Sequence, residues 1–342
     1  MKKSEPSNAK RPIDRLREGA GLFEINTPDD KTPISGMISI GDKRLLIVKG
    51  NGIYEMKLAD QTDPERTNMN IPTTIQKVLP YGSDDHWIGA VLLTADELLK
   101  ESILGKEIDR EKILTMVIRI SQDIAAGLEV LESYSKKEQV ALENFNPQIR
   151  DNRSVILPSI NDASSLCKEF IQKLDHALRE LFNIVKLFHD GVGSGGWDSL
   201  KTVIEGEPNK VDNFIAFIDG ALPLLRLVRN SRNCVEHPHD GNNLEVSDFS
   251  ISPENNLVPP LITINHSKTP LKATPVSVFF SHTSDEIICI VELMLVFLCS
   301  RKVKSVAGLP VQVYEKQEDQ RRSKYVKYGY GIPNGDTIVP FG

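Results

Sequence analysis

A short polar segment combines residue types that are suited to phosphate chemistry. Arg229, Arg232 and His237 lie there, at the end of a helical run rich in leucine, and Pro238 follows the histidine. Proline lacks a backbone donor and disfavours the helical conformation of the preceding residue, so we predict that the helix ends at about Glu236 or His237. Imidazoles titrate near neutral pH, and unpaired carbonyls at a helix end favour their protonated form. The segment therefore suits an anionic substrate that needs proton transfer, such as a phosphodiester.

The six residues from Arg232 to His237, Arg-Asn-Cys-Val-Glu-His, resemble the R-N-x-x-x-H motif of HEPN (higher eukaryotes and prokaryotes nucleotide-binding) domains. Many of these helical bundles are metal-independent ribonucleases. The resemblance covers roughly residues 161–304, and within this range only the six-residue motif is specific. It implies that the 2′-hydroxyl of RNA attacks the adjacent phosphate, which yields a 2′,3′-cyclic phosphate and a 5′-hydroxyl without a cofactor.

The resemblance implies a role for each polar residue of the motif. His237 would transfer protons, typically worth about 10²- to 10⁴-fold in rate. Arg232 would bind the phosphate, because its planar fork of donors fits phosphate oxygens, and Asn233 would orient the imidazole or bind a phosphate oxygen. Arg229 is a candidate outer phosphate contact, on a basic ridge that it forms with Arg226 and Arg232 at three-residue spacing.

The spacing of the motif residues bears on the oligomeric state of the protein. Arg232 and His237 are five residues apart, which separates them by about 140° around an ideal helix. One helix therefore does not easily bring both side chains to one phosphate. Family members commonly pair two motifs across a dimer, and a symmetric dimer would place two histidines and two arginines in one cleft. We predict a homodimer.

Three other interpretations of the segment are open. It can be an ordinary helix end with solvated arginines and a capping histidine. It can belong to a HEPN-like module that binds a nucleotide or a protein without cleaving RNA. It can also be part of a metal hydrolase that uses His237, His239 and Asp240, with His282 as a further, distant ligand. The first three lie too close together to fill a metal site alone, so we predict no metal and no cofactor.

Composition limits the classes of function. A chain of 342 residues allows one to three domains, and its net charge of −6 argues against a protein that coats DNA or RNA generally. The four cysteines lie in apolar helical stretches without metal-ligand spacing, which indicates free thiols in a reducing compartment. The first residues contain no signal-like apolar stretch, and the apolar run 287–299 is too short to span a bilayer. We expect a cytoplasmic protein without membrane contact.

Hydrophobic periodicity predicts a mainly α, α+β fold. We expect five segments: a disordered tail (1–18), a β-rich module (19–105), a helical linker or support region (106–158), a HEPN-like helical bundle (159–305) and a C-terminal β-hairpin extension (306–342). Long helices are predicted over 109–135 and 163–189, from apolar side chains at helical spacing. Three short apolar runs separated by turn signals predict a β-meander, at residues 37–40, 44–49 and 53–58.

The remaining elements are predicted from local signals. Residues 87–94 predict a strand, and Gly220 and Pro223 predict a kink or break in the helix that carries the motif. The glycine-rich residues 191–197 follow a helix and lack the Lys-Ser/Thr of a P-loop, which favours a linker. Two hairpins and one further helix are expected, at residues 244–251 with 261–265, at 311–314 with 325–330, and at 287–301.

Extra segments on both sides of the helical domain are typical of a regulated effector. Prokaryotic HEPN proteins often belong to toxin–antitoxin, abortive-infection or other defence systems. The resemblance therefore implies RNA as the substrate and a regulatory or antitoxin protein as a candidate partner. Nothing in the residues of the N-terminal module names a ligand for it.

Overall fold

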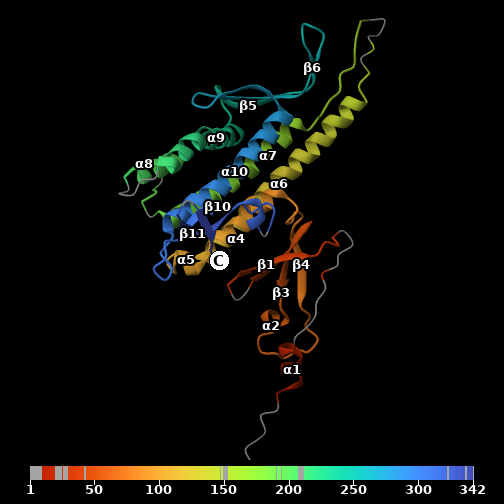
Figure 1. The fold of residues 1–342 in the computed structure, drawn as a ribbon. Coiled ribbons are helices and arrows are strands. Elements are labelled where there is room, and N and C mark those ends of the chain that lie inside the picture. The colour runs from red at the N-terminus through yellow and green to blue at the C-terminus, as the bar shows by residue number, and fades with distance from the viewer. Residues whose placement is uncertain are drawn as a thin grey trace, which may run out of the picture. The chain divides into compact units, whose positions relative to one another are not determined.

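The computed structural model describes residues 10–19, 25, 30–41, 44–146, 148, 153–189, 191–193, 195–206, 212–321, 323–335 and 337–341 (Figure 1). The fold is mixed α+β, as predicted, and helices are more extensive than strands. The chain divides into two compact units, residues 1–88 and 89–342. The boundary falls before the one predicted at 105, and the predicted linker over 106–158 contributes its helix to the second unit.

The first unit contains a four-stranded antiparallel sheet in the order β1-β2-β3-β4. Its strands are β1 (Ile34–Ile40), β2 (Arg44–Lys49), β3 (Gly52–Lys57) and β4 (Thr74–Leu79). The predicted meander is confirmed by the first three strands, and β4 is an addition. One face of the sheet carries a buried apolar cluster that includes Ile47, Tyr54 and Met56.

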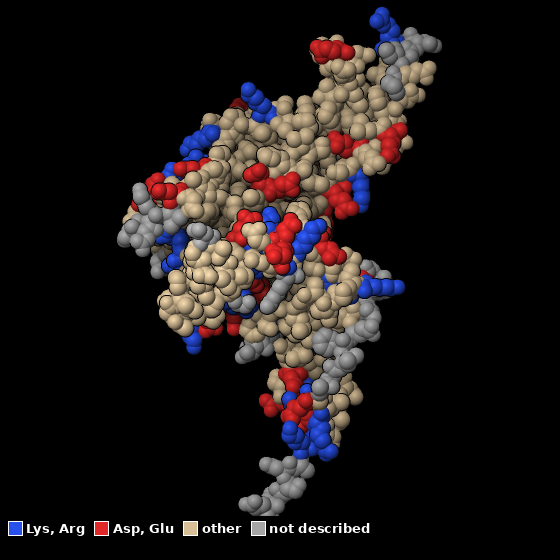
Figure 2. All heavy atoms as spheres, viewed as in Figure 1, with Lys and Arg blue, Asp and Glu red and all other residues tan. Residues whose placement is uncertain are grey.

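The N-terminal tail is more ordered than predicted. Within residues 1–18, Pro12–Glu18 form helix α1, whereas residues 1–9 lie outside the described part of the chain. Arg17 of α1 pairs with Asp60 at 2.9 Å, and Arg66 pairs with carboxylates of α1. Asp60 belongs to the short helix α2 (Ala59–Thr62), and Figure 2 shows the acidic and basic side chains of this region lying together. These ion pairs order a segment whose polar composition indicated disorder.

The predicted strand over residues 87–94 is wrong. This run forms part of α3 (His86–Ile88), the π-helix η1 (Gly89–Leu93) and the start of α4 (Thr94–Leu98), and α5 (Glu101–Leu104) follows. Nearly every residue of the run is buried, so apolar side chains occur on all sides of the helix and their spacing shows no helical period. A short apolar run of this kind cannot be assigned to strand or helix by periodicity alone.

Helices form most of the second unit. They are α6 (Arg110–Glu143), α7 (Ala163–Phe188), α8 (Trp197–Gly206), α9 (Asp212–Glu236) and α10 (Val276–Lys302) (Figure 1). The prediction for α7 is confirmed, while α6 is one helix that continues past its predicted end at 135. The start of α10 precedes its predicted start at 287 by three turns, and Pro275 is its N-cap.

Aromatic contacts join the long helices into one core. Phe280 of α10 is fully buried, with its ring stacked on Phe170 of α7 at 4.1 Å and edge-on to Tyr134 of α6 at 5.4 Å. Phe297, further along α10, stacks on Phe214 of α9 at 4.8 Å. Helix α10 therefore contacts each of the other three long helices through apolar side chains.

Helix α9 continues through Gly220 and Pro223, so of the predicted kink or break the break is wrong. Both residues lie on the exposed side of the helix, where water can bind the carbonyl that loses its partner to proline. The opposite side is buried along its length, through Phe214, Ile218, Ala221, Leu222, Leu225 and Val228. Packing of this face maintains the helix despite two residues that disfavour it locally.

Small antiparallel sheets complete the second unit. The predicted hairpin after the motif is confirmed as β5 (Asn242–Ser247) paired with β8 (Leu261–His266), to which β9 (Leu271–Pro275) adds a third strand. At its tip, β6 (Ser250–Ile251) pairs with β7 (Leu257–Val258). The predicted C-terminal hairpin is also three-stranded, with β10 (Gln312–Glu315), β11 (Tyr328–Asn334) and β12 (Thr337–Pro340).

A buried carboxyl in α10 makes the stability of the fold depend on pH. Glu292 is 5% exposed, its Oε1 has no hydrogen-bond partner among the described residues, and its Oε2 lies 3.9 Å from Nζ of Lys327. Burial raises the pKa of this carboxyl, because the charged form loses its hydration. The folded state therefore holds this proton to higher pH than the unfolded state, and stability falls as pH rises through that window.

We expect Glu292→Gln to raise the free energy of unfolding at pH 8 by on the order of 1 kcal/mol and to change little at pH 4. At pH 4 the wild-type carboxyl is protonated in the folded chain, so glutamine resembles it closely. Urea denaturation at both pH values measures the difference, and exposed Glu286→Gln on the same helix is the control. Equal effects of Glu292→Gln at the two pH values would contradict this account.

Candidate functional site

The predicted end of the motif helix is confirmed: α9 ends at Glu236. The backbone N–H of His237 donates to the carbonyl of Asn233 at 2.8 Å, and the chain then leaves the helix. Asn242 fixes the following turn, because its Nδ2 donates to the carbonyl of His237 at 3.1 Å and its Oδ1 accepts from Sγ of Cys234 at 3.3 Å. His237 is exposed, so its backbone is held in place while its ring faces solvent.

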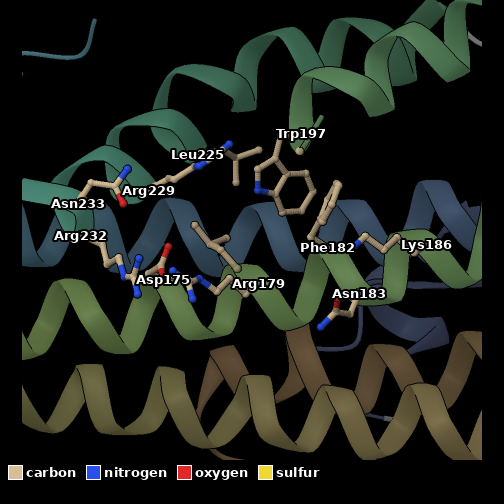
Figure 3. Close-up of a pocket in the computed structure, with 12 residues that line it drawn as sticks. Asp175, Arg179, Phe182, Asn183, Lys186, Trp197, Leu225, Arg229, Arg232 and Asn233 are labelled. Atoms are coloured by element: carbon tan, nitrogen blue, oxygen red, sulfur yellow. Dashed lines mark ion pairs between the residues drawn. The ribbon is translucent and has the colours of Figure 1, made fainter. Parts of the chain in front are cut away.

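A cavity of about 450 Å³ lies between α7, α8 and α9 (Figure 3). Its walls carry four cationic side chains, namely Arg179 and Lys186 from α7 and Arg229 and Arg232 from α9. Two aromatic rings, Phe182 and Trp197, meet edge to face with their centroids 4.9 Å apart. The amides of Asn183 and Asn233 also line it. We call this cavity the motif groove.

Arg229 is a cation of the motif groove that is available for a ligand. It is exposed and forms no ion pair with a described residue. Gly196 has a φ of +70°, and a Cβ at that position would lie 3.0 Å from Nη1 of Arg229. Glycine there both permits the turn into α8 and leaves room for the guanidinium. The nearby Lys186 lies over the ring of Phe182, with Nζ 4.8 Å from the centroid.

The predicted basic ridge is divided by acidic partners. Arg226 pairs with Asp198 of α8 and does not line the motif groove. Arg232 forms an ion pair with Glu236 one turn further on, and its Nε lies 3.8 Å from Oδ2 of Asp175. The three arginines of the ridge therefore have different surroundings, and of these only Arg229 has no acidic partner among the described residues.

Asp175 of α7 lies between two arginines of the motif groove. Its side chain is 4% exposed, and Oδ2 is 2.6 Å from Nε of Arg179 as well as 3.8 Å from Nε of Arg232. Neither approach has hydrogen-bond geometry. Oδ2 of Asp175 and Nε of Arg232 are therefore both buried without a hydrogen bond among the described residues. Burial raises the pKa of Asp175 although both guanidinium groups act to lower it. The carboxylate of Asp175 neutralises part of the positive charge of these two guanidinium groups, which a bound phosphate could otherwise neutralise.

The structure brings together three of the four predicted site residues. Arg229, Arg232 and Asn233 line the motif groove, whereas His237 does not and lies one turn beyond Asn233. This separation agrees with the angle expected between Arg232 and His237. One chain therefore presents the arginines in the groove and the imidazole beyond its end.

Sequence reasoning missed the contribution of α7 and α8 to the site. Asp175 follows Leu174 in the apolar stripe of α7, and an acid next to a stripe predicted to be buried was the available signal. Arg179 lies one turn after Asp175, is exposed and lines the motif groove. Trp197 begins α8, for which the glycine-rich segment before it gave no indication.

Comparison of the chain with protein-family models, with curated proteins and with solved structures found no match. Among the described residues, no three His, Cys, Asp or Glu side chains are grouped so that they could hold a metal ion. The metal-hydrolase interpretation through His237, His239, Asp240 and His282 therefore has no ligand set in this part of the chain. No helix of the described segments combines the length and apolar composition that crossing a bilayer requires.

We expect Asp175→Asn to strengthen binding of a 2′-O-methyl RNA oligonucleotide by about tenfold, roughly 1.4 kcal/mol. Asparagine keeps the shape of the side chain and removes the charge that competes with phosphate for Arg179 and Arg232. Fluorescence anisotropy with a labelled oligonucleotide measures the affinity. Asp198→Asn, which frees Arg226 outside the motif groove, is the matched control. Weaker binding in Asp175→Asn would instead show that Asp175 holds Arg232 in its binding position.

Proposed function

We propose that this chain is a metal-independent endoribonuclease of HEPN type, whose long helices form a HEPN-like bundle. One observation carries the proposal: Arg229, Arg232 and Asn233 line one groove with aromatic rings, and the exposed His237 follows one turn beyond its end. Cations bind phosphate and aromatic rings stack on bases, which are the two requirements of a single-stranded RNA site. The proton-transfer group is adjacent to these residues in the same motif.

Cleavage would proceed by attack of the ribose 2′-hydroxyl oxygen on the adjacent phosphorus. One imidazole takes the proton of the 2′-hydroxyl, and the bond between phosphorus and the 5′-oxygen breaks. A second imidazole donates a proton to that leaving oxygen. Arg232 binds the phosphate oxygens, whose negative charge grows in the transition state, after it exchanges Glu236 for the substrate. The products are a 2′,3′-cyclic phosphate and a 5′-hydroxyl.

A homodimer would supply the second imidazole. Since His237 does not line the motif groove of its own chain, a symmetry-related copy could bring its His237 to the phosphate that Arg232 binds. We expect light scattering at working concentration to give the mass of two chains. A monodisperse monomer that cleaves RNA would contradict the shared site.

In the cell, this activity would belong to a regulated toxin or defence effector that acts on cytoplasmic RNA. A regulatory or antitoxin protein would restrain it. This part of the proposal rests on the motif resemblance.

The test is incubation of purified protein with labelled RNA in the presence of EDTA. The proposal predicts cleavage that survives EDTA and is lost in Arg232→Ala and His237→Ala. Cleavage that EDTA abolishes would favour metal-dependent chemistry. A complete lack of cleavage by the dimer would favour the second candidate function.

That second candidate is a HEPN-like module that binds a nucleotide or a protein without cleaving RNA. The acidic partners of Arg232, together with the position of His237 outside the motif groove, favour it. In this case Arg229 and Lys186 hold the ligand phosphate, and Trp197 and Phe182 contact its base. Oligonucleotide binding that depends on Arg229 but not on His237, without cleavage, would support this function.

A further inference from the structure

A second cavity, of about 570 Å³, lies between α9, the turn joining β8 to β9, and the first turns of α10. Its floor is apolar and includes Leu224 and Leu227 of α9, Leu271 of β9 and Phe279 of α10. Val278, which is 55% exposed, lies on its lining and is accessible to solvent. A volume of this size and an apolar lining are typical of small-molecule sites.

The charged groups around this cavity are all basic. Arg226, Lys268 and His282 line it, and no acidic residue does. Arg226 is already paired with Asp198, whereas Lys268 and His282 form no ion pair with a described residue. Lys268 therefore places a cation on the lining that no acidic side chain of the described residues compensates. This arrangement is complementary to a ligand with one negative charge.

The turn that closes one side of the cavity is attached to α9. Oγ1 of Thr269 accepts a hydrogen bond from Nδ2 of Asn230 at 3.1 Å, and the backbone N–H of Thr269 donates to Nδ1 of His266 at 3.3 Å. These contacts hold Lys268 next to the apolar floor. The cavity lies on the side of α9 that carries Leu224 and Leu227, while Leu225 and Arg229 line the motif groove.

We propose that this cavity binds an amphipathic monoanion: a carboxylate with an aliphatic body. The aliphatic body covers the apolar floor, and Lys268 binds the carboxylate, with His282 beside it. The site is separate from the motif groove and does not depend on the proposed ribonuclease activity. Its occupant contacts the same helix that carries the motif, through Leu224 and Leu227.

Isothermal titration calorimetry of the 342-residue chain with dodecanoate, below its micelle concentration, tests the proposal. We expect one site per chain, and octanoate should bind more weakly, by up to about fourfold for each methylene removed. Dodecanol, which lacks the charge, should bind at least threefold more weakly than dodecanoate. Equal affinity for the alcohol, tighter binding of dodecyl phosphate, or no binding of dodecanoate would each overturn the assignment.

Variants locate the bound ligand. Lys268→Glu should weaken dodecanoate binding about tenfold, because an attraction becomes a repulsion. Val278→Glu, which adds a negative charge to the lining at an exposed position, should have a similar effect without unfolding the chain. Val339→Glu is the control, because Val339 is 48% exposed on β12 and lies outside the cavity lining. Unchanged affinity in both cavity variants, or an equal loss in the control, would contradict binding at this place.

Discussion

Replacing His237 with alanine is expected to lower the rate of RNA cleavage by about 10²- to 10⁴-fold, because the imidazole is the proton-transfer group of the proposed reaction. Binding of uncleaved RNA should change little, since His237 does not line the motif groove. The loss should therefore appear in kcat and leave KM nearly unchanged. Single-turnover cleavage of a labelled oligonucleotide in EDTA measures it.

His239→Ala provides the matched control for this prediction. His239 is also exposed and lies two residues further along the chain, where its Nδ1 contacts the carbonyl of Asp240. Neither substitution removes a buried side chain, so both variants should retain the stability of the wild-type chain within about 0.5 kcal/mol. A similar loss of activity in both variants, or none in His237→Ala, would remove the histidine from the mechanism.

The second large effect concerns the core that positions the motif groove. Phe280→Ala should lower the free energy of unfolding of the second unit by about 3–5 kcal/mol, because the substitution leaves a cavity between α6, α7 and α10. Phe280 is fully buried and contacts both Phe170 and Tyr134. Because these neighbours lie on two different helices, movement of one of them cannot fill the cavity.

Tryptophan fluorescence allows this loss to be assigned to the second unit. The chain has two tryptophans, and Trp197 is the one in that unit. Urea denaturation in a Trp87→Phe background therefore follows the second unit alone. Val278→Ala, an exposed position on the same helix, should change stability by less than about 0.5 kcal/mol. A loss in Phe280→Ala as small as in this control would show that the aromatic cluster does not stabilise the unit.

Local sequence signals were sufficient to predict an element where a single physical effect determined its structure. Pro238 ends α9 because the residue before proline avoids the helical conformation, and the apolar stripe of α7 predicts that helix because its period is maintained for seven turns. The meander of the first unit follows from short apolar runs joined by glycine turns. These features depend on neighbours in sequence.

Tertiary packing determined the elements that the sequence did not predict. The buried face of α9 maintains the helix across Gly220 and Pro223, and burial on all sides removes the period from residues 87–94. The same limit applies to the candidate site. Arg229, Arg232 and Asn233 could be identified from the motif, but Asp175 joins them only because α7 packs against α9. The apolar stripe beside Asp175 indicates that this residue is buried, but no local pattern indicates that it faces Arg232 of α9.

The central claim is that the 2′-hydroxyl of the substrate cleaves the RNA, with Arg232 on the phosphate and His237 moving the protons. Mass spectrometry of the products formed in EDTA tests it most directly. The account predicts a new 3′ end lighter than a linear phosphate by one water, the mark of a 2′,3′-cyclic phosphate, with a 5′-hydroxyl on the other fragment. It also predicts that fully 2′-O-methylated RNA stays intact. Products with a 5′-phosphate, or cleavage of the methylated RNA, would contradict it.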